Sequence, residues 1–133
     1  MRYSDLMADD YMLKNDYNCA EAMLRAANEA YDLGLSEEAL RAASPFGGGM
    51  GREDACGALT GALMVLGVLR CSGKQHQDPR LGELRDELVR RFEERFGSIE
   101  CRRIKATHRD AERGCSPVTE VTAEILETVV AKE

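Results

Sequence analysis

Hydrophobic residues recur along the chain at the three- and four-residue spacing of amphipathic helices. The clearest run stops at Gly97 and places five apolar side chains on one face of a strongly charged segment: Leu81, Leu84, Leu88, Phe92 and Phe96. The same spacing predicts a helix between Asn18 and Gly34, on Ala20, Met23, Leu24, Ala27 and Tyr31. These patterns predict an all-α fold.

Capping and helix-ending residues mark the joints in the first half of the chain. Ser36 precedes two acidic residues, which is typical of a helix start, and the short helix that it opens has to end before Pro45. A glycine-rich joint follows at 46–51. Asp54 is then the expected cap of an apolar helix that runs to about Arg70.

Capping and helix-ending residues also mark the joints in the second half of the chain. Residues 72–79 are polar and loop-like, and Gly97 is followed by Ser98, the expected cap of a further helix. Ser116 and Pro117 predict the start of the last helix, because Ser caps well and Pro suits the first helical position. We therefore expect a compact bundle of about six helices with a central apolar helix, in a single domain over 1–133.

Composition and charge limit the classes of function that the chain can have. A chain of 133 residues can bury a core without metal or disulfide staples, and an aromatic content of 5% without Trp favours helix over strand. The net charge of −6 argues against nucleic-acid binding. Residues 1–10 lack the apolar core of a secretory signal, and the uncharged stretch 55–69 is too short to span a bilayer. We expect a cytoplasmic protein with no membrane span.

Four of the five cysteines fall at predicted helix N-termini: Cys19, Cys56, Cys101 and Cys115. Cys71 differs, because it follows the C-terminal end of the central helix. A helix N-terminus favours anions and lowers a thiol pKa, so we expect reactive or metal-binding thiolates that converge on one centre. The plainer interpretation is that these small apolar side chains only pack at helix ends.

Glycines add a second pattern around the second cysteine. The joint at 47–51 can follow backbone paths closed to other residues, which suits the wall of a pocket. Gly57 and Gly61 lie on one helix face, where a missing side chain admits either a neighbouring helix or a bound group. A nucleotide-binding loop is rejected, since no strand precedes these glycines and no Gly-Lys-Ser/Thr follows them.

The chain contains, in order, Asn18-Cys19-Ala20-Glu21-Ala22, Phe46-Gly47-Gly48-Gly49-Met50-Gly51, Cys56-Gly57-Ala58-Leu59-Thr60-Gly61, Phe96-Gly97-Ser98 with Cys101, and Cys115. Together these residues resemble the C-GCAxxG-C-C family, a bacterial and archaeal family with a proposed redox role. The resemblance implies that the family's four cysteines are Cys19, Cys56, Cys101 and Cys115, and that its motif glycines, here cofactor-binding candidates, are Gly57 and Gly61. Cys71 has no counterpart.

The resemblance also suggests a cofactor. A related domain occurs in split-Soret-type cytochromes, where an iron-sulfur cluster is associated with similar cysteines. Four thiolates are the usual ligand set of such a cluster, so we expect the same four cysteines to bind one for electron transfer or redox sensing. Covalent haem is not expected, since the chain has no Cys-x-x-Cys-His motif.

Three alternatives stay open at this point. The first is a metal-free dithiol and disulfide oxidoreductase with a low-pKa thiolate such as Cys56 as the attacking group. The second is a structural zinc site, although paired Cys-x-x-Cys spacing is absent. The third is a non-catalytic helical interaction module, whose apolar surfaces would serve a homodimer. The sequence names no redox partner and leaves open whether the centre turns over a substrate.

Other polar residues near the cysteines give weaker signals. His108 follows Cys101 by seven positions, which places both on one helical face, and His76 lies in a polar loop where we expect it to be exposed. A basic run next to Cys101 either lowers its pKa, attracts an anionic partner or forms a solvated helix face: Arg102, Arg103, Lys105 and Arg109.

Overall fold

The computed structural model describes residues 2–131, and this part of the chain contains helices and no β-strand. The all-α prediction is confirmed. The described helices, three of them only five or six residues long, are α1 (Tyr3–Ala8), α2 (Tyr11–Asn15), α3 (Cys19–Ala30), α4 (Glu37–Arg41), α5 (Gly57–Arg70), α6 (Pro79–Phe96), α7 (Cys101–His108) and α8 (Ser116–Val130). Single turns of 3-10 helix lie at Ser44–Phe46 and Gln75–Gln77, and Gly49–Glu53 forms an irregular turn in which Met50 and Gly51 have left-handed backbone angles.

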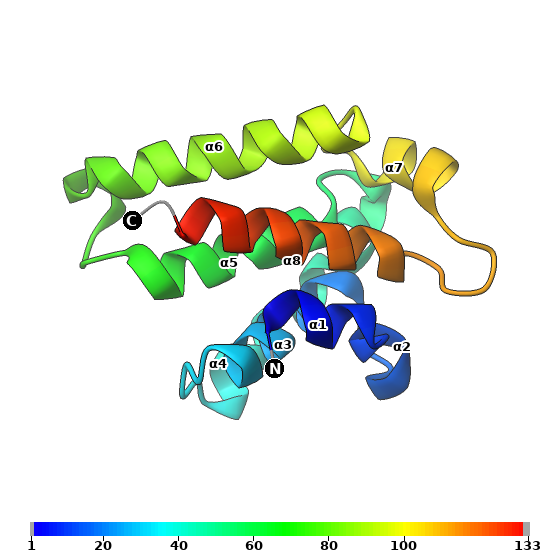
Figure 1. Cartoon of the computed structure of the whole chain (residues 1–133), viewed down its shortest axis with the longest axis horizontal. Helices are drawn as coiled ribbons and strands as arrows, with labels where there is room; N and C mark the ends of the chain where they lie inside the picture. Colours follow the sequence, from blue (N-terminus) through cyan, green and yellow to red (C-terminus); the bar gives the residue numbers. More distant parts are fainter. Residues whose placement is uncertain (1, 132–133) are drawn as a thin grey trace.

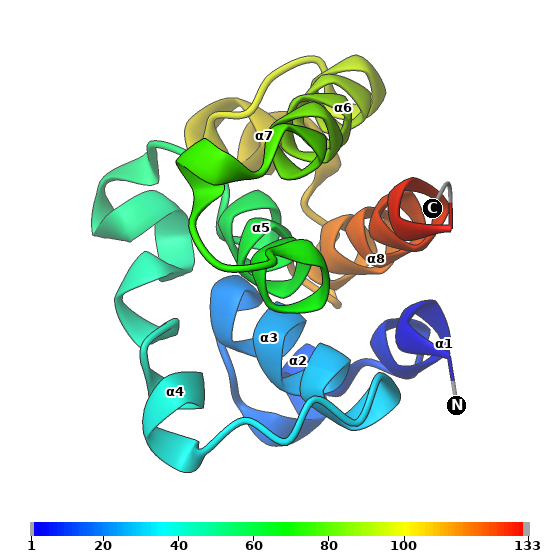
Figure 2. The ribbon, with the colours of Figure 1, turned by 90° about the vertical axis from the view of Figure 1, so that its left-hand side faces the viewer.

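The apolar helix α5 lies at the centre of the bundle, as predicted. It packs against α3 on one side and against α6 and α8 on the other (Figure 2). The helices α5, α6 and α8 run side by side along the long axis, while α1 packs alongside α8 and α7 lies at one end (Figure 1). The face of α6 predicted from the hydrophobic spacing is buried: Leu81, Leu84, Leu88, Phe92 and Phe96. No described helix is both long and apolar enough to span a bilayer.

The contact between α3 and α5 depends on two glycines. An ideal Cβ atom at Gly61 would lie 2.6 Å from the Cβ of Met23 and 3.0 Å from the carbonyl oxygen of Ala20. A Cβ atom at Gly57 would overlap the sulfur of Cys19. The two helices therefore approach each other more closely than side chains at these positions allow, which is the helix-packing role considered above.

Several predicted helix ends are confirmed by the capping hydrogen bonds. The Asn18 side chain accepts from the backbone N–H of Glu21 at 2.9 Å, and the Glu21 carboxylate accepts from the N–H of Asn18 at 3.0 Å. Ser36 caps α4 by accepting from the N–H of Ala39 at 3.1 Å. Gly97 ends α6 in the left-handed conformation, with φ of +80°.

The predicted caps of α5 and α7 are wrong. The helix α5 begins at Gly57, with Cys56 rather than Asp54 as its N-cap residue, because the 54–56 backbone bonds elsewhere. The N–H of Cys56 donates to the carbonyl of Ile99 at 2.8 Å, and the N–H of Cys101 donates to the carbonyl of Asp54 at 2.5 Å. Because of these pairings, α7 begins only at Cys101. The Ser98 hydroxyl does not cap the helix and instead accepts from the N–H of Glu100 in a local turn.

The predicted start of the last helix is displaced by one residue. Ser116 is its first residue, and Cys115 takes the N-cap position. The segment before it closes a tight turn in which Asp110 and Gly114 exchange backbone hydrogen bonds of 2.8 and 2.9 Å. That turn leaves Ser116 buried inside the first turn of α8, where its hydroxyl finds no hydrogen-bond partner among the described residues. Cys115 is therefore the residue at the N-terminal end of α8.

Candidate functional site

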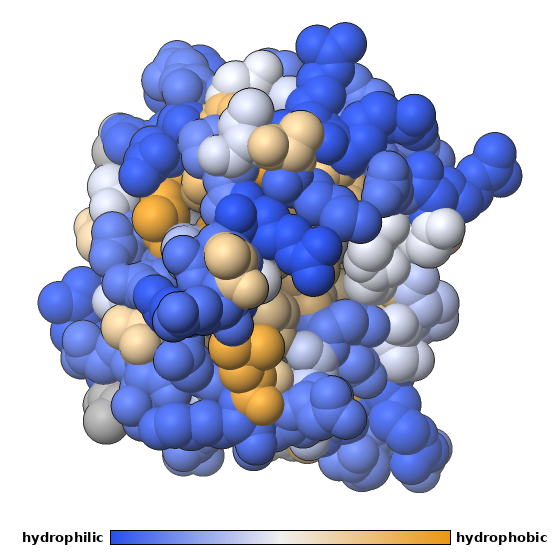
Figure 3. All heavy atoms as spheres, turned by 90° about the vertical axis from the view of Figure 1, so that its right-hand side faces the viewer, coloured by the Kyte–Doolittle hydropathy of each residue, from blue (hydrophilic) through white to orange (hydrophobic). Residues whose placement is uncertain are grey.

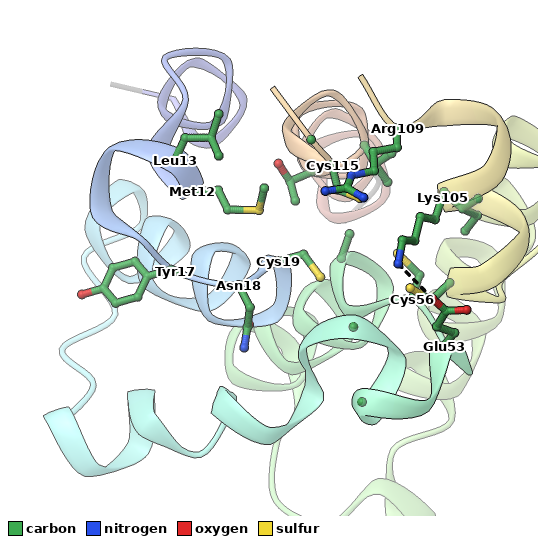
Figure 4. Close-up of a pocket in the computed structure, with 18 residues that line it drawn as sticks. Met12, Leu13, Tyr17, Asn18, Cys19, Glu53, Cys56, Lys105, Arg109 and Cys115 are labelled. Atoms are coloured by element: carbon green, nitrogen blue, oxygen red, sulfur yellow. Dashed lines mark hydrogen bonds and ion pairs between the residues drawn. The ribbon is translucent and has the colours of Figure 1, made fainter. Parts of the chain in front are cut away.

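The N-termini of α3, α5, α7 and α8 meet around one cavity of about 500 Å³. All four cysteines that the sequence singled out line it: Cys19, Cys56, Cys101 and Cys115. Figure 4 shows the Cys19 side chain directed from α3 toward the cavity, with Cys56 and Cys115 across from it. The five cysteines of the chain are free thiols. The fold thus brings together residues that are far apart in the sequence.

The glycine-rich joint holds the start of α3 next to this cavity. The Asn18 amide donates to the carbonyl of Ser44 at 2.9 Å, and a Cβ atom at Gly47 would overlap the Asn18 side chain. Further along the joint, Gly49 has φ of +62°, and a Cβ atom there would lie 2.8 Å from the Cβ of Cys101. The joint therefore forms part of the wall around the cysteines, as its glycine content indicated.

Cys56 is the most deeply buried of the four thiols, with 6% of its surface exposed, whereas the other three are half-buried. Burial, followed by the nearby Cys19, raises the pKa of Cys56 to about 12. The N–H groups of Ala58 and Leu59 lower this pKa only in part. At neutral pH the Cys56 side chain is therefore a protonated thiol.

The expected lowering of the thiol pKa is wrong for the two half-buried cysteines Cys101 and Cys115 as well. Burial raises the pKa of each, and Cys19 adds to the effect because like charges repel across the cavity. Lys105 acts in the opposite direction on both thiols but does not reverse the shift. Loss of solvation and crowding of sulfurs thus outweigh the helix ends and the basic run.

The fifth cysteine and the two histidines lie away from the cavity lining. Cys71 is the C-cap residue of α5, and its thiol lies 3.5 Å from the carbonyl oxygen of Gly73. Fifteen helical steps place it about 22 Å from Cys56 along the axis. His108 packs edge-on against Phe96, with ring centroids 5.2 Å apart, and His76 is exposed as expected.

The motif glycines lie behind the sulfurs, at the contact between α3 and α5. Gly57 is directly against the sulfur of Cys19, and Gly61 is one turn further along α5. Their observed contacts are with protein atoms, which accounts for the absence of a side chain at both positions. Their assignment as cofactor-binding residues stays a prediction.

Several lining residues carry chemistry that the sequence did not assign to a site. Lys105 forms an ion pair of 2.9 Å with Glu53, next to Cys56 in Figure 4. The guanidinium of Arg109 has no hydrogen bond or ion pair with any residue in the described range 2–131, and it extends over Cys115 toward the cavity (Figure 4). Both cations belong to the basic run that the sequence shows next to Cys101, but the sequence did not place them at a cavity. Met12 and Leu13 complete the opposite wall, and nothing in their polar sequence context singled them out.

The sulfurs surround the cavity without meeting at one point. Within residues 2–131, no three or more His, Cys, Asp or Glu side chains are close enough to hold one metal ion. A tetrahedral zinc site requires four ligand atoms about 2.0–2.3 Å from a single centre. The arrangement instead offers four separate sulfur donors around a shared space.

Comparison with known proteins identifies the group to which this chain is related. A family model described as a putative redox-active protein (C-GCAxxG-C-C) matches residues 17–129, a range that contains all four cavity cysteines and both motif glycines. No curated protein and no solved structure gives a significant match. Because the family model covers most of the sequence, the chain belongs to the C-GCAxxG-C-C family of putative redox-active proteins.

Proposed function

We propose that the four cavity cysteines, Cys19, Cys56, Cys101 and Cys115, bind an iron-sulfur cluster and that the protein transfers electrons or senses redox state through it. The observation that carries this proposal is the placement of four free thiols from four different helix N-termini around one cavity. Four cysteine thiolates are the usual ligands of two-iron and four-iron clusters. When bound, such a cluster supplies a redox couple whose potential depends on the surrounding protein.

The separation of the sulfurs favours a cluster over a single ion. The donors do not converge on one point, as a tetrahedral zinc ion requires. A cluster distributes its four ligands over several iron atoms, so its protein sulfurs stand around it. A cavity of about 500 Å³ leaves space for a group of this kind. The four cysteine donors and the space between them support the cluster proposal.

Charge compensation provides the second support. A cluster with four thiolates is anionic, and the site lies at four helix N-termini, whose unpaired N–H groups favour negative charge. Lys105 and Arg109 add cationic groups to the lining. Metal binding also offsets the raised thiol pKa, because a coordinating thiol gives up its proton to the metal's positive charge. We place this chemistry in the cytoplasm, where cysteines stay reduced.

The metal-free disulfide alternative is weaker in this geometry. A thiol-disulfide exchange needs a thiolate as the attacking group. The pKa of about 12 leaves Cys56 almost entirely protonated at neutral pH, so it does not suit the attacking role considered for it. Exchange among Cys19, Cys101 and Cys115 remains the competing mechanism.

Metal analysis of anaerobically purified protein tests the proposal. We expect iron and acid-labile sulfide, visible absorption that bleaches reversibly with a reductant, and little zinc. The Cys56→Ser variant should lose iron while keeping its helical content, and the matched Cys71→Ser variant should keep both. Zinc without sulfide would replace the cluster by a structural site. Metal-free protein that also fails to take up iron and sulfide would overturn the proposal, and thiols that then pair reversibly on oxidation would establish the disulfide mechanism.

A further inference from the structure

The cysteine cavity has two chemically different sides. One side carries Cys56, Cys101 and Cys115 together with Lys105 and Arg109, across from Cys19. The other is formed by apolar side chains, Met12 and Leu13 on α2 and Val118 on α8. In Figure 4 the two labelled α2 residues lie across the open space from Arg109 and Lys105. A group held by the cysteines alone would leave the exposed Leu13 side chain of this wall uncovered.

The size and exposure of the apolar wall fit a small organic molecule. The cavity volume of about 500 Å³ is within the 300–1,000 Å³ that is typical of small-molecule sites, where one water occupies about 30 Å³. Leu13 keeps 47% of its surface exposed, so its side chain is accessible to a molecule that enters the cavity. Seen from the end that carries α2 and α7, hydrophobic atoms lie in and beside a hollow among hydrophilic ones (Figure 3).

The charges around the cavity indicate the polar part of this molecule. Arg109 is directed into the space and has no hydrogen-bond or ion-pair partner in the described part of the chain. Lys105 is already paired with Glu53, so Arg109 is the cation available to a ligand. A guanidinium matches a carboxylate in a planar, two-point hydrogen-bonded pair. The protein as a whole has a net charge of −6, so a cation at this cavity contrasts with the negative charge of the rest of the protein.

We infer that the cavity binds a small organic carboxylate, whose anionic group pairs with Arg109 and whose apolar part lies against Met12, Leu13 and Val118, beside the cysteines. The inference rests on the proposed function in one respect: it makes the bound carboxylate the molecule on which the redox centre acts or to which it responds. Binding itself requires only the cavity and can be measured without a cluster.

The test uses hexanoate as the probe and the full chain in its reduced, metal-free form. Ligand-observed NMR and calorimetry should detect hexanoate binding at millimolar concentration. Its neutral isostere hexanamide should bind about tenfold more weakly, because it loses the charge-assisted pair with Arg109. Arg109→Gln should weaken hexanoate by a similar factor and leave hexanamide unchanged. Arg85→Gln, which alters an exposed arginine on α6, is the matched control.

A second variant and its control test the contribution of the apolar wall. Leu13→Ala should weaken both hexanoate and hexanamide, because both lose the same buried contact. Val68→Ala removes a side chain of similar exposure, 45%, on α5 outside the cavity lining and should change neither. Absence of hexanoate binding, equal affinity for hexanamide, or indifference to Arg109→Gln and Leu13→Ala would each overturn the inference.

The two proposals fail separately. Protein that acquires a cluster but does not bind hexanoate, in either its metal-free or its loaded form, overturns the carboxylate site and leaves the cluster standing. Protein that binds hexanoate in the Arg109-dependent manner but takes up no iron and sulfide overturns the cluster and leaves the carboxylate site standing. The iron analysis and the binding measurement are made on the same preparation.

Discussion

Replacing Gly61 by Ala tests the close approach of α3 and α5, on which the position of Cys19 depends. The added Cβ atom would stand 2.6 Å from the Cβ of Met23 and 3.0 Å from the carbonyl oxygen of Ala20. Neither atom is the end of a flexible side chain, so the helices have to move apart. Gly67 is the internal control, because it lies on the same helix and a Cβ atom there meets nothing within 4 Å.

The magnitude follows from two opposing effects. Ala is favoured over Gly inside a helix by about 1 kcal/mol, and this gain is common to both variants. Overpacking of a well-packed contact costs about 1–3 kcal/mol, and only Gly61→Ala incurs it. We therefore expect Gly67→Ala to raise the free energy of unfolding by up to about 1 kcal/mol. Gly61→Ala should be about 1–3 kcal/mol less stable than Gly67→Ala.

Urea unfolding followed by circular dichroism, with thiols kept reduced, measures this difference. Movement of α3 also displaces Cys19 from the cavity, so Gly61→Ala should take up less iron than Gly67→Ala under identical reconstitution. Equal stabilisation by the two substitutions would contradict this expectation, because it would mean that α3 and α5 leave room for a side chain at position 61.

The thiols and the helix caps can be tested by substitution in the same way. Cys56→Ser should abolish iron uptake with little change in the circular dichroism spectrum, whereas Cys71→Ser should retain wild-type uptake; loss of iron in the Cys71 variant would show that the choice of four ligands is wrong. The pKa of Cys56 rises from 9.0 to about 12 on folding, so above pH 9 its thiol ionises in the unfolded chain but not in the folded protein. The contribution of this group to the free energy of unfolding is therefore fully present below pH 9. Between pH 9 and about 12 it falls by about 1.4 kcal/mol per pH unit. Urea titrations of metal-free protein should show that slope reduced in Cys56→Ser, and an unchanged slope would contradict the burial argument. Asn18→Ala should cost about 1 kcal/mol of unfolding free energy through the lost capping box, and Ser36→Ala, which uncaps the five-residue α4, should cost less in the same assay.

Local signals predicted much of this fold because they act within a few residues. A helix was expected to begin next to Asn18, which forms a capping box with Glu21, and Gly97 ends α6 where it was expected to. The placement of the cysteines at helix N-termini followed from such signals even where a cap was misassigned. Cys56 and Cys115 turned out to be N-cap residues themselves.

Features that depend on distant partners escaped the sequence analysis. Asp54 did not cap α5, because its carbonyl accepts from Cys101 in a pairing between segments far apart in the chain. The direction of the thiol pKa shifts depended on burial and on the other sulfurs, neither of which local sequence reveals. The apolar wall of the cavity was missed for the same reason, since Leu13 lies in a polar stretch and only the fold places it opposite Arg109.

A site-resolved thiol footprint shows whether the four cavity cysteines together hold one centre. The protein reconstituted with iron and sulfide is alkylated under anaerobic conditions, and each cysteine-containing peptide is quantified by mass spectrometry against metal-free, denatured protein. We predict that the four cavity cysteines are protected together and that Cys71 is labelled, with protection lost when the cluster is removed by a chelator and an oxidant. Labelling of any of the four in cluster-loaded protein, or protection of Cys71, would contradict a centre built by these four sulfurs.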